Sequence, residues 1–189
     1  IRLGKRTEDK VPLIRDLIPM AELDDLVFGG WDIHGENAFE AAQTAGVLKG
    51  EELEDIRDEL SAIQPMKAVF DNDWVRRLRG THLKEGLNKW EQSVALMEDI
   101  ETFKRDHECD RLVSIWCGST EKYINLKQVH LTLEAFEKGL KENDNDISPS
   151  MIYAYAHIKA GVPYANGAPN LGCDLPALEE LANQKKVPI

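Results

Sequence analysis

Small and polar residues follow apolar runs at three places in the sequence, and each place has residue types that could contact a nucleotide. Residues 29–33, the first loop, read GGWDI. The two glycines would let the backbone approach a ligand closely, and Asp32 could accept hydrogen bonds from a ribose or a cofactor amide. A tight turn capped by the same aspartate is the competing interpretation, and it is the commoner one for a lone glycine pair.

Residues 117–122, the second loop, read CGSTEK and follow the apolar run DRLVSIWC. Small side chains, exposed backbone N–H groups and two hydroxyls directly after a buried strand suit a phosphate or a ribose. A turn closed by Ser119 or Thr120 explains the same residues equally well. Glu121 and Lys122 are expected at the surface, where Lys122 could supply a local positive charge.

Residues 166–169, the third loop, read NGAP, and Asn and Gly both tolerate positive φ. A plain turn is favoured here, although the position after a predicted strand keeps the loop a candidate. The basic cluster WVRRLRG, with Lys84 beyond it, is most simply a solvated helix face and alternatively an anion site. The five histidines share no metal-ligand spacing, so we predict no metal site, and no nucleophile motif predicts a catalytic residue.

Charge and cysteine content narrow the classes of partner. The chain has 23 Lys and Arg against 34 Asp and Glu, a formal net charge of -11, which predicts no nucleic-acid or anionic-membrane partner. Its three cysteines include no CxxC pair, as expected in a reducing compartment. No stretch approaches the roughly 20 apolar residues of a membrane span, and the first residues lack the apolar centre of a signal peptide. These features predict a cytoplasmic protein.

The elements that must position the three loops alternate between strands and helices. Short strands are predicted over residues 25–28, closed by Gly29 and Gly30, and over 110–117, whose almost continuous apolar run is typical of a parallel strand covered on both faces. A third follows at 162–167, and 67–70 is ambiguous between strand and loop. Helical spacing predicts helices over residues 36–46, 50–63, 83–107, 126–142 and 148–160, with a final one opened by Asp174 and Pro176.

This alternation predicts an α/β fold with a mainly parallel sheet and flanking helices. In such sheets ligands bind at the carboxyl ends of the strands, which is where all three loops would lie. The longest helix carries one apolar stripe, which base rates of burial assign to the core rather than to a cofactor. Its residues are Leu87, Trp90, Val94, Met97, Ile100 and Phe103.

Four motifs, in order and at similar spacing, resemble the myo-inositol-1-phosphate synthases, also named inositol-3-phosphate synthases. They read FGGWDI, SIWCGSTEKY, ISPSMIYAYAHIKAGVPYANGAPN and LPALEELANQKKVPI, and the similarity runs from about residue 25 to residue 189. The resemblance implies an incomplete portion of a Rossmann-like NAD-binding domain. It also implies that residues 1–189 are the middle of that domain, with the glycine-rich dinucleotide loop before Ile1 and the catalytic and tetramerisation domain after Ile189.

The activity that the resemblance implies is that of an NAD-dependent isomerase, an intramolecular lyase. Members of the family convert D-glucose 6-phosphate into 1D-myo-inositol 3-phosphate by oxidation, enolisation, intramolecular aldol cyclisation and reduction, with no net redox change. The product feeds inositol and phospholipid biosynthesis and so lipid metabolism. The family also implies a homo-tetramer for the full-length protein, and the lack of catalytic segments implies that this chain alone is inactive.

Matching the family's motifs position by position assigns cofactor contacts to the three loops. The second loop aligns with a Thr-Ala-Asn-Thr run of which only Thr120 is identical, so backbone contacts should survive better than side-chain contacts. The predicted cofactor-binding residues are Asp32, Ile33, Cys117, Gly118, Ser119, Thr120 and Gly167. No catalytic residue is assigned within the chain.

Two other classes of function remain open at this point. An ordinary NAD-dependent dehydrogenase would need a catalytic His or a Tyr–Lys pair near the nicotinamide, and no histidine is expected at the ends of the three loops. A non-catalytic fragment or assembly module is the other alternative.

Overall fold

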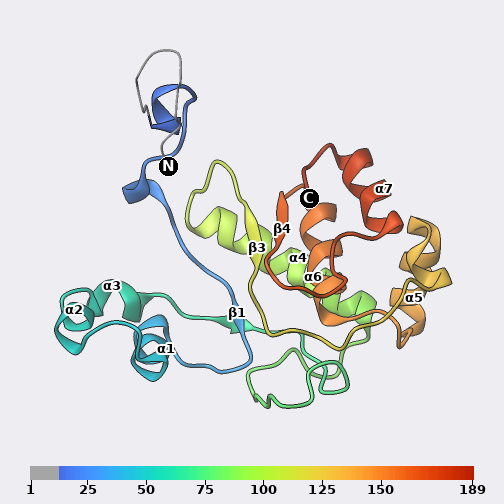
Figure 1. The fold of residues 1–189 in the computed structure, drawn as a ribbon, viewed down its shortest axis with the longest axis horizontal. Helices are drawn as coiled ribbons and strands as arrows, with labels where there is room; N and C mark the ends of the chain where they lie inside the picture. Colours follow the sequence, from blue (N-terminus) through green and yellow to red (C-terminus); the bar gives the residue numbers. More distant parts are fainter. Residues whose placement is uncertain (1–12) are drawn as a thin grey trace.

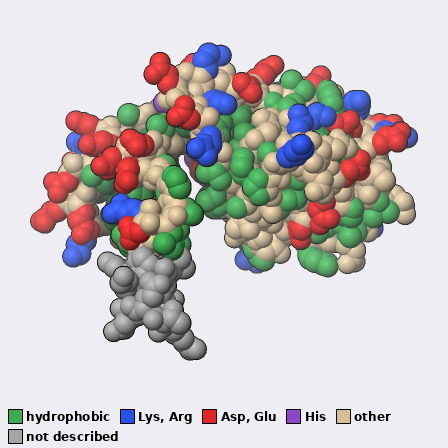
Figure 2. All heavy atoms as spheres, turned by 90° about the horizontal axis from the view of Figure 1, so that it is seen from above, with side chains coloured by type: hydrophobic (Ala, Val, Ile, Leu, Met, Phe, Trp, Pro, Cys, Tyr) green, Lys and Arg blue, Asp and Glu red, His purple; other side chains and the backbone are tan. Residues whose placement is uncertain are grey.

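The structure, a computed structural model, describes residues 13–189. Figure 1 shows helices α4 (Lys89–Asp106), α5 (Leu133–Glu142), α6 (Pro149–Lys159) and α7 (Pro176–Lys185) packed together on one side. On the other side, α1 (Ala38–Ala45), α2 (Gly50–Glu54) and α3 (Arg57–Ala62) form a smaller group. Acidic side chains gather over this smaller group in Figure 2, in keeping with the exposed Glu and Asp residues of α2 and α3.

Four short strands lie between the helices and pair in parallel, two by two. Strand β1 (Trp31–Asp32) pairs with β2 (Met66–Lys67), and β3 (Ser114–Trp116) pairs with β4 (Tyr164–Asn166). A parallel bridge between Ala68 and Leu83 extends the first pair. Each pair is connected through helices, as parallel strands require. The predicted α/β fold with parallel strands and flanking helices is confirmed.

Helix α6 is the centre of the core. Its residues 149–158 are all buried, because α4 and α7 pack against it and its sequence is mostly apolar, with Ser150 and His157 as the polar exceptions. The predicted start is confirmed: the Ser148 hydroxyl accepts a hydrogen bond from the Met151 N–H, and Pro149 occupies the first turn. Because it lies beneath both strand pairs, α6 sets the position of the loops that follow them.

Helix α1 also forms where the sequence predicts it. Asn37 accepts from the Glu40 N–H, and the Glu40 carboxylate accepts from the Asn37 N–H, each at 3.0 Å, which is a reciprocal capping box. Gly46 ends the helix in the left-handed region. The final helix, α7, likewise has Pro176 in its first turn, although its cap is Leu175 rather than Asp174.

The predicted strand at residues 25–28 is wrong. Residues 23–25 form a 3-10 turn, and Phe28 is 67% exposed. The strand begins later because the Met66 N–H bonds to the Gly30 carbonyl oxygen, which brings Trp31 and Asp32 beside β2. The two glycines therefore lead into the strand instead of closing it.

The strand predicted over residues 110–117 is shorter and less covered than expected. Only Ser114–Trp116 is strand, while Val113 is 74% and Ile115 is 65% exposed. Within residues 13–189 this strand has one neighbour, β4, and no helix covers its second face. The prediction of a strand in this apolar run is confirmed, but the prediction that both of its faces are buried is wrong.

Three predicted helices have different bounds. The pattern over residues 50–63 is broken between α2 and α3, where Ile56 leaves helical geometry. The long helix begins at Lys89, and its buried residues are Ser93, Leu96 and Ile100. The predicted apolar stripe is therefore only partly buried, and Leu87 is exposed. The predicted helix over 126–142 begins at Leu133, after a 3-10 turn over Gln128–His130. No helix among residues 13–189 is both long and apolar enough to cross a bilayer.

Candidate functional site: a cleft between two pairs of parallel strands

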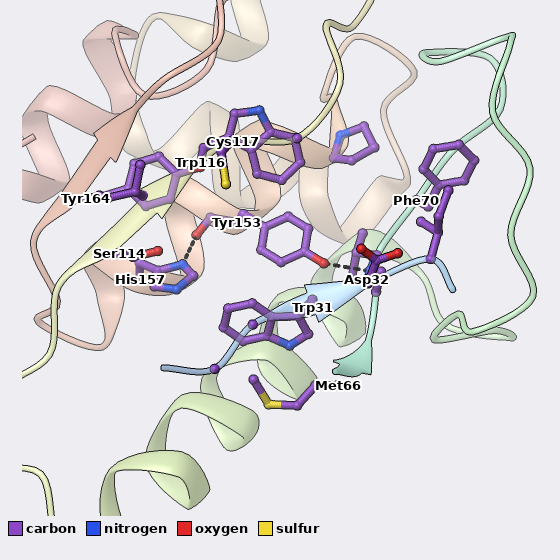
Figure 3. Close-up of a pocket in the computed structure, with 18 of the residues that line it drawn as sticks. Trp31, Asp32, Met66, Phe70, Ser114, Trp116, Cys117, Tyr153, His157 and Tyr164 are labelled. Atoms are coloured by element: carbon purple, nitrogen blue, oxygen red, sulfur yellow. Dashed lines mark hydrogen bonds between the residues drawn. The ribbon is translucent and has the colours of Figure 1, made fainter. Parts of the chain in front are cut away.

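A cleft of about 550 Å³ runs between β1 and β3, and residues of the first and second loops line it (Figure 3). Its volume falls within the roughly 300–1,000 Å³ of pockets that bind small molecules. Apolar side chains from the strands and from α4 form most of its walls. The sequence thus predicted correctly that the first two loops lie close together, although they are 84 or more positions apart in the chain.

Aromatic side chains of α6 form the floor of the cleft. In Figure 3 the ring of Tyr153 lies between Trp31 on β1 and Trp116 on β3. The centre of its ring is 5.4 Å from that of Trp31 and 5.2 Å from that of Trp116. The Tyr153 hydroxyl accepts a 2.9 Å hydrogen bond from the Val69 N–H, so the tyrosine also fixes the segment after β2.

His157 lies one turn further along α6 and lines the same cleft. Its ring packs edge-on to Trp31 at 5.3 Å, and Nδ1 lies 2.7 Å from the Tyr153 carbonyl oxygen. Burial lowers the pKa of His157 to about 4, and the hydrogen bond to Tyr153 only partly opposes this. At neutral pH the imidazole is uncharged, so Nδ1 carries a proton and donates to the carbonyl.

Two strand edges border the cleft. Ser114 donates to the Pro163 carbonyl and Trp116 accepts from the Gly167 N–H, so these residues use their backbone groups to pair with β4. Because successive residues of a strand direct these groups to opposite edges, Ile115 directs its own away from β4. On β1, Trp31 likewise directs its backbone N–H and carbonyl away from the paired strand, β2. Within residues 13–189 no strand pairs with either edge, which leaves backbone donors and acceptors beside the cleft.

The first loop presents one exposed carboxylate at the end of β1. Asp32 accepts a 2.8 Å hydrogen bond from the His34 N–H through Oδ1, while Oδ2 accepts no bond from residues 13–189. Asp32 therefore closes a turn, as the competing interpretation expected, and still has a free oxygen for a ligand. Gly29 lies against the Phe103 ring, where a side chain would collide.

The second loop is exposed from Cys117 to Thr120. The backbone N–H groups of Gly118, Ser119 and Thr120 have no acceptor among residues 13–189. A Cβ on Gly118 would lie 2.7 Å from the Trp116 ring, so only glycine lets the backbone lie this close to the indole. These free donors at the carboxyl end of β3 suit the oxygens of a phosphate or a ribose.

Glu121 was wrongly predicted to lie at the surface. The residue is 4% exposed, and its carboxylate accepts hydrogen bonds from Ser150 at the start of α6 and from Asn170 after the third loop. Lys122 is exposed, as expected, with Nζ 4.3 Å from the centre of the Trp74 ring. Sequence spacing alone did not place Glu121 beside α6, because the contact partners lie 29 and 49 positions away.

The third loop lies behind the cleft instead of in it. Gly167 donates its N–H to the Trp116 carbonyl oxygen at 2.8 Å, and a Cβ there would lie 2.7 Å from the same oxygen. Among residues 13–189, neither Gly167 nor Thr120 lines the cleft. Gly167 thus supports the strand that leads into the second loop, and its contact with a cofactor stays a prediction.

The other candidates from the sequence are the basic cluster, the histidines and the cysteines. The basic cluster is not helical: Arg79 bonds to the carbonyls of Arg76 and Leu78, and Lys84 forms an ion pair with Asp99. His34 lines the cleft beside Ile33, so the expectation that no histidine lies at a loop end was wrong. All three cysteines are free thiols, and residues 13–189 contain no cluster of potential metal ligands.

The whole chain matches one family of proteins. A model of an NAD-binding domain, described as Myo-inositol-1-phosphate synthase, matches residues 1–189. Over 178 residues the chain is 50% identical to inositol-3-phosphate synthase 1 of Bacteroides thetaiotaomicron, covering 94% of this chain and 42% of that protein. It is 31% identical to isozyme 1 of Arabidopsis thaliana over 192 residues, covering 99% of this chain and 37% of the isozyme.

A solved structure has the same fold. The crystal structure of inositol-3-phosphate synthase from Caenorhabditis elegans superposes with a TM-score of 0.88 at 28% identity, over 99% of this chain and 38% of that one. The chain therefore spans about two fifths of the length of the relatives that it matches.

Proposed function

The chain belongs to the myo-inositol-1-phosphate synthase family, whose NAD-binding model it matches throughout, and we propose that the full-length protein is an inositol-3-phosphate synthase. Its reaction is the isomerisation of D-glucose 6-phosphate to 1D-myo-inositol 3-phosphate. Residues 1–189 then form the middle portion of the NAD-binding domain, and this portion alone is inactive. The 50% identity to the Bacteroides enzyme supports the assignment more than any single motif does.

Within the domain, the residues of the three loops would hold the cofactor. The free Oδ2 of Asp32 would accept from a ribose hydroxyl, and Ile33 would pack beside it. The unpaired N–H groups of Gly118, Ser119 and Thr120 would donate to ribose or phosphate oxygens, next to Cys117. Gly167 would act from behind by holding Trp116.

The bound NAD supplies hydride acceptance and return, which leaves no net redox change over the reaction. This chain contributes binding, orientation and exclusion of water from one wall of the cleft. Tyr153 and His157 are uncharged at neutral pH and offer an apolar floor. A general acid or base for the chemical steps is expected from the rest of the protein.

We infer a cytoplasmic enzyme that assembles as a homo-tetramer and supplies inositol for phospholipid biosynthesis. The net charge of -11 supports a protein without affinity for nucleic acid or anionic membrane.

The structural observation that carries the proposed cofactor binding is the cleft lined by both the first and the second loops, with an exposed carboxylate on one side and unpaired N–H groups on the other. A dehydrogenase would use a similar cofactor cleft. Of the two histidines that line the cleft, His157 has a buried ring bonded to Tyr153, whereas His34 is exposed, so the reaction product has to distinguish a dehydrogenase from a synthase.

Incubation of the full-length protein with glucose 6-phosphate and a catalytic amount of NAD tests the proposal. We expect inositol phosphate to accumulate over many turnovers per NAD, with no accumulation of NADH. Stoichiometric NADH without inositol phosphate would identify a dehydrogenase instead. Failure to bind NAD would support the non-catalytic alternative.

A further inference from the structure

Glu121 joins three segments that are far apart in the sequence. Oε1 accepts a 2.8 Å hydrogen bond from the Ser150 N–H, and Oε2 accepts from the Ser150 hydroxyl at 2.6 Å and from the Asn170 amide at 3.3 Å. Ser150 lies in the first turn of α6, and Asn170 follows the third loop. One buried carboxylate therefore connects the second loop, α6 and the segment after β4.

The hydrogen bonds continue beyond the carboxylate. The Asn170 amide also donates to the Ser150 hydroxyl at 3.0 Å, and the Ser148 hydroxyl lies 3.0 Å from that same oxygen. Asn166, at the end of β4, donates to the Asn170 carbonyl at 3.0 Å. The network thus reaches from the second loop to the first residue of the third loop.

The three hydrogen bonds to the Glu121 carboxylate all come from donors, which suits the ionised form. No Lys or Arg of residues 13–189 forms an ion pair with it, and the N-terminus of α6 supplies the favourable field. Burial raises the pKa of Glu121 and the negative charge of Asp71 adds to the increase, while the hydrogen bonds from Ser150 oppose it. Burying a carboxylate is costly, and an apolar side chain would fill the same space at lower cost.

The second loop has few other anchors. Residues 117–120 are exposed and their N–H groups are unpaired, so the loop is held at its far end by Glu121 and by the bond from the Lys122 N–H to the Trp74 carbonyl. We propose that Glu121 is a positioning residue that holds the second and third loops in the arrangement that binds the cofactor. This inference rests on the proposed function. Glu121 acts through the loops, and the residues next to it make the cofactor contacts.

The test compares variants of the full-length protein by two measurements, amide hydrogen exchange over residues 117–120 and 166–171 and NAD affinity by calorimetry. Glu121→Ala removes all three accepted bonds, Glu121→Gln keeps the bond from the Ser150 N–H, and Asn170→Ala removes the connection to the third loop. Glu137→Gln is the matched control, because Glu137 is a partly buried carboxylate bonded to Tyr155 and Lys159, away from the loops.

We expect Glu121→Ala to raise exchange in both loops and to weaken NAD binding about tenfold, the loss expected for one charged hydrogen bond. Glu121→Gln should raise exchange and weaken NAD binding less than Glu121→Ala does. Glu137→Gln should change neither exchange in the two loops nor NAD affinity. Unchanged exchange and affinity in Glu121→Ala and Asn170→Ala would overturn the proposal, as would equal effects of Glu137→Gln. If Glu121→Ala does not fold, Glu121→Gln and Asn170→Ala decide. If the wild-type protein binds no NAD, the proposed function fails, and exchange alone decides the positioning role.

Discussion

The indole of Trp31 donates a 2.6 Å hydrogen bond to Oδ2 of Asp99, and this connects the first loop to α4. The same oxygen forms a 2.8 Å ion pair with Lys84, whose side chain is largely buried. Asp99 thus satisfies two groups at once beside the cleft, where an unpaired donor or charge would be costly.

Replacement of Asp99 by alanine should therefore destabilise the protein by about 2 kcal/mol, because it leaves the Trp31 N–H and the Lys84 ammonium without a partner. Thermal unfolding of the full-length protein, followed by tryptophan fluorescence, measures the effect. Glu98→Ala is the control, since Glu98 is the neighbouring exposed carboxylate on the same helix. Equal stability of the two variants would mean that the bond contributes nothing.

Asp32→Ala should weaken NAD binding about tenfold while costing about 1 kcal/mol or less of stability. The side chain is exposed and its one bond within residues 13–189 is to the His34 N–H, so little folding energy depends on it. Asp32→Asn keeps an oxygen that can accept the bond from the His34 N–H but removes the negative charge. It therefore distinguishes the effect of the charge on NAD binding from the effect of the turn. Calorimetric titration with NAD decides: unchanged affinity in Asp32→Ala would return this residue to the role of a turn cap.

The sequence predicted best those elements whose signals are local. The start of α6 at Ser148 and Pro149, the end of α1 at Gly46 and the short strand before Gly167 depend on neighbouring residues only, and all three formed as expected. The convergence of the first two loops also followed from a general property, since parallel strands bring their carboxyl ends to one edge.

The errors came from contacts that no local pattern encodes. Val27 and Ile115 look like buried strand residues, but burial depends on which element covers them, and both are exposed. Glu121 looks like a surface residue until α6 brings Ser150 against it.

Gly118→Ala should reduce NAD affinity by about tenfold or more, because the added methyl group would lie 2.7 Å from the Trp116 ring and push the second loop from its place. Gly50→Ala is the matched control: a Cβ at Gly50, at the start of α2, meets no atom within 4 Å. Titration of both full-length variants with NAD gives the comparison. If Gly118→Ala binds as the wild type does, close approach of the loop to the indole is not needed for the cofactor.

His157 should make stability depend on acid pH. The ordinary pKa of a histidine side chain is 6.5. Burial penalises the charged form and lowers the pKa of His157 to about 4 in the folded protein. Between these values the unfolded chain binds a proton that the folded protein does not. Stability from this group is therefore complete above pH 6.5 and is lost as the pH falls to about 4, by about 3 kcal/mol in total.

The measurement is urea unfolding of the full-length wild type and of His157→Gln at several pH values from 7 to 4. The other ionisable groups are common to both proteins, so the difference in their free energies of unfolding isolates this one side chain. At pH 7 the variant should be less stable, since it loses the ring contacts to Trp31 and Tyr164. The difference should shrink by about 3 kcal/mol as the pH falls to 4. A constant difference would show that the imidazole titrates alike in the folded and unfolded states.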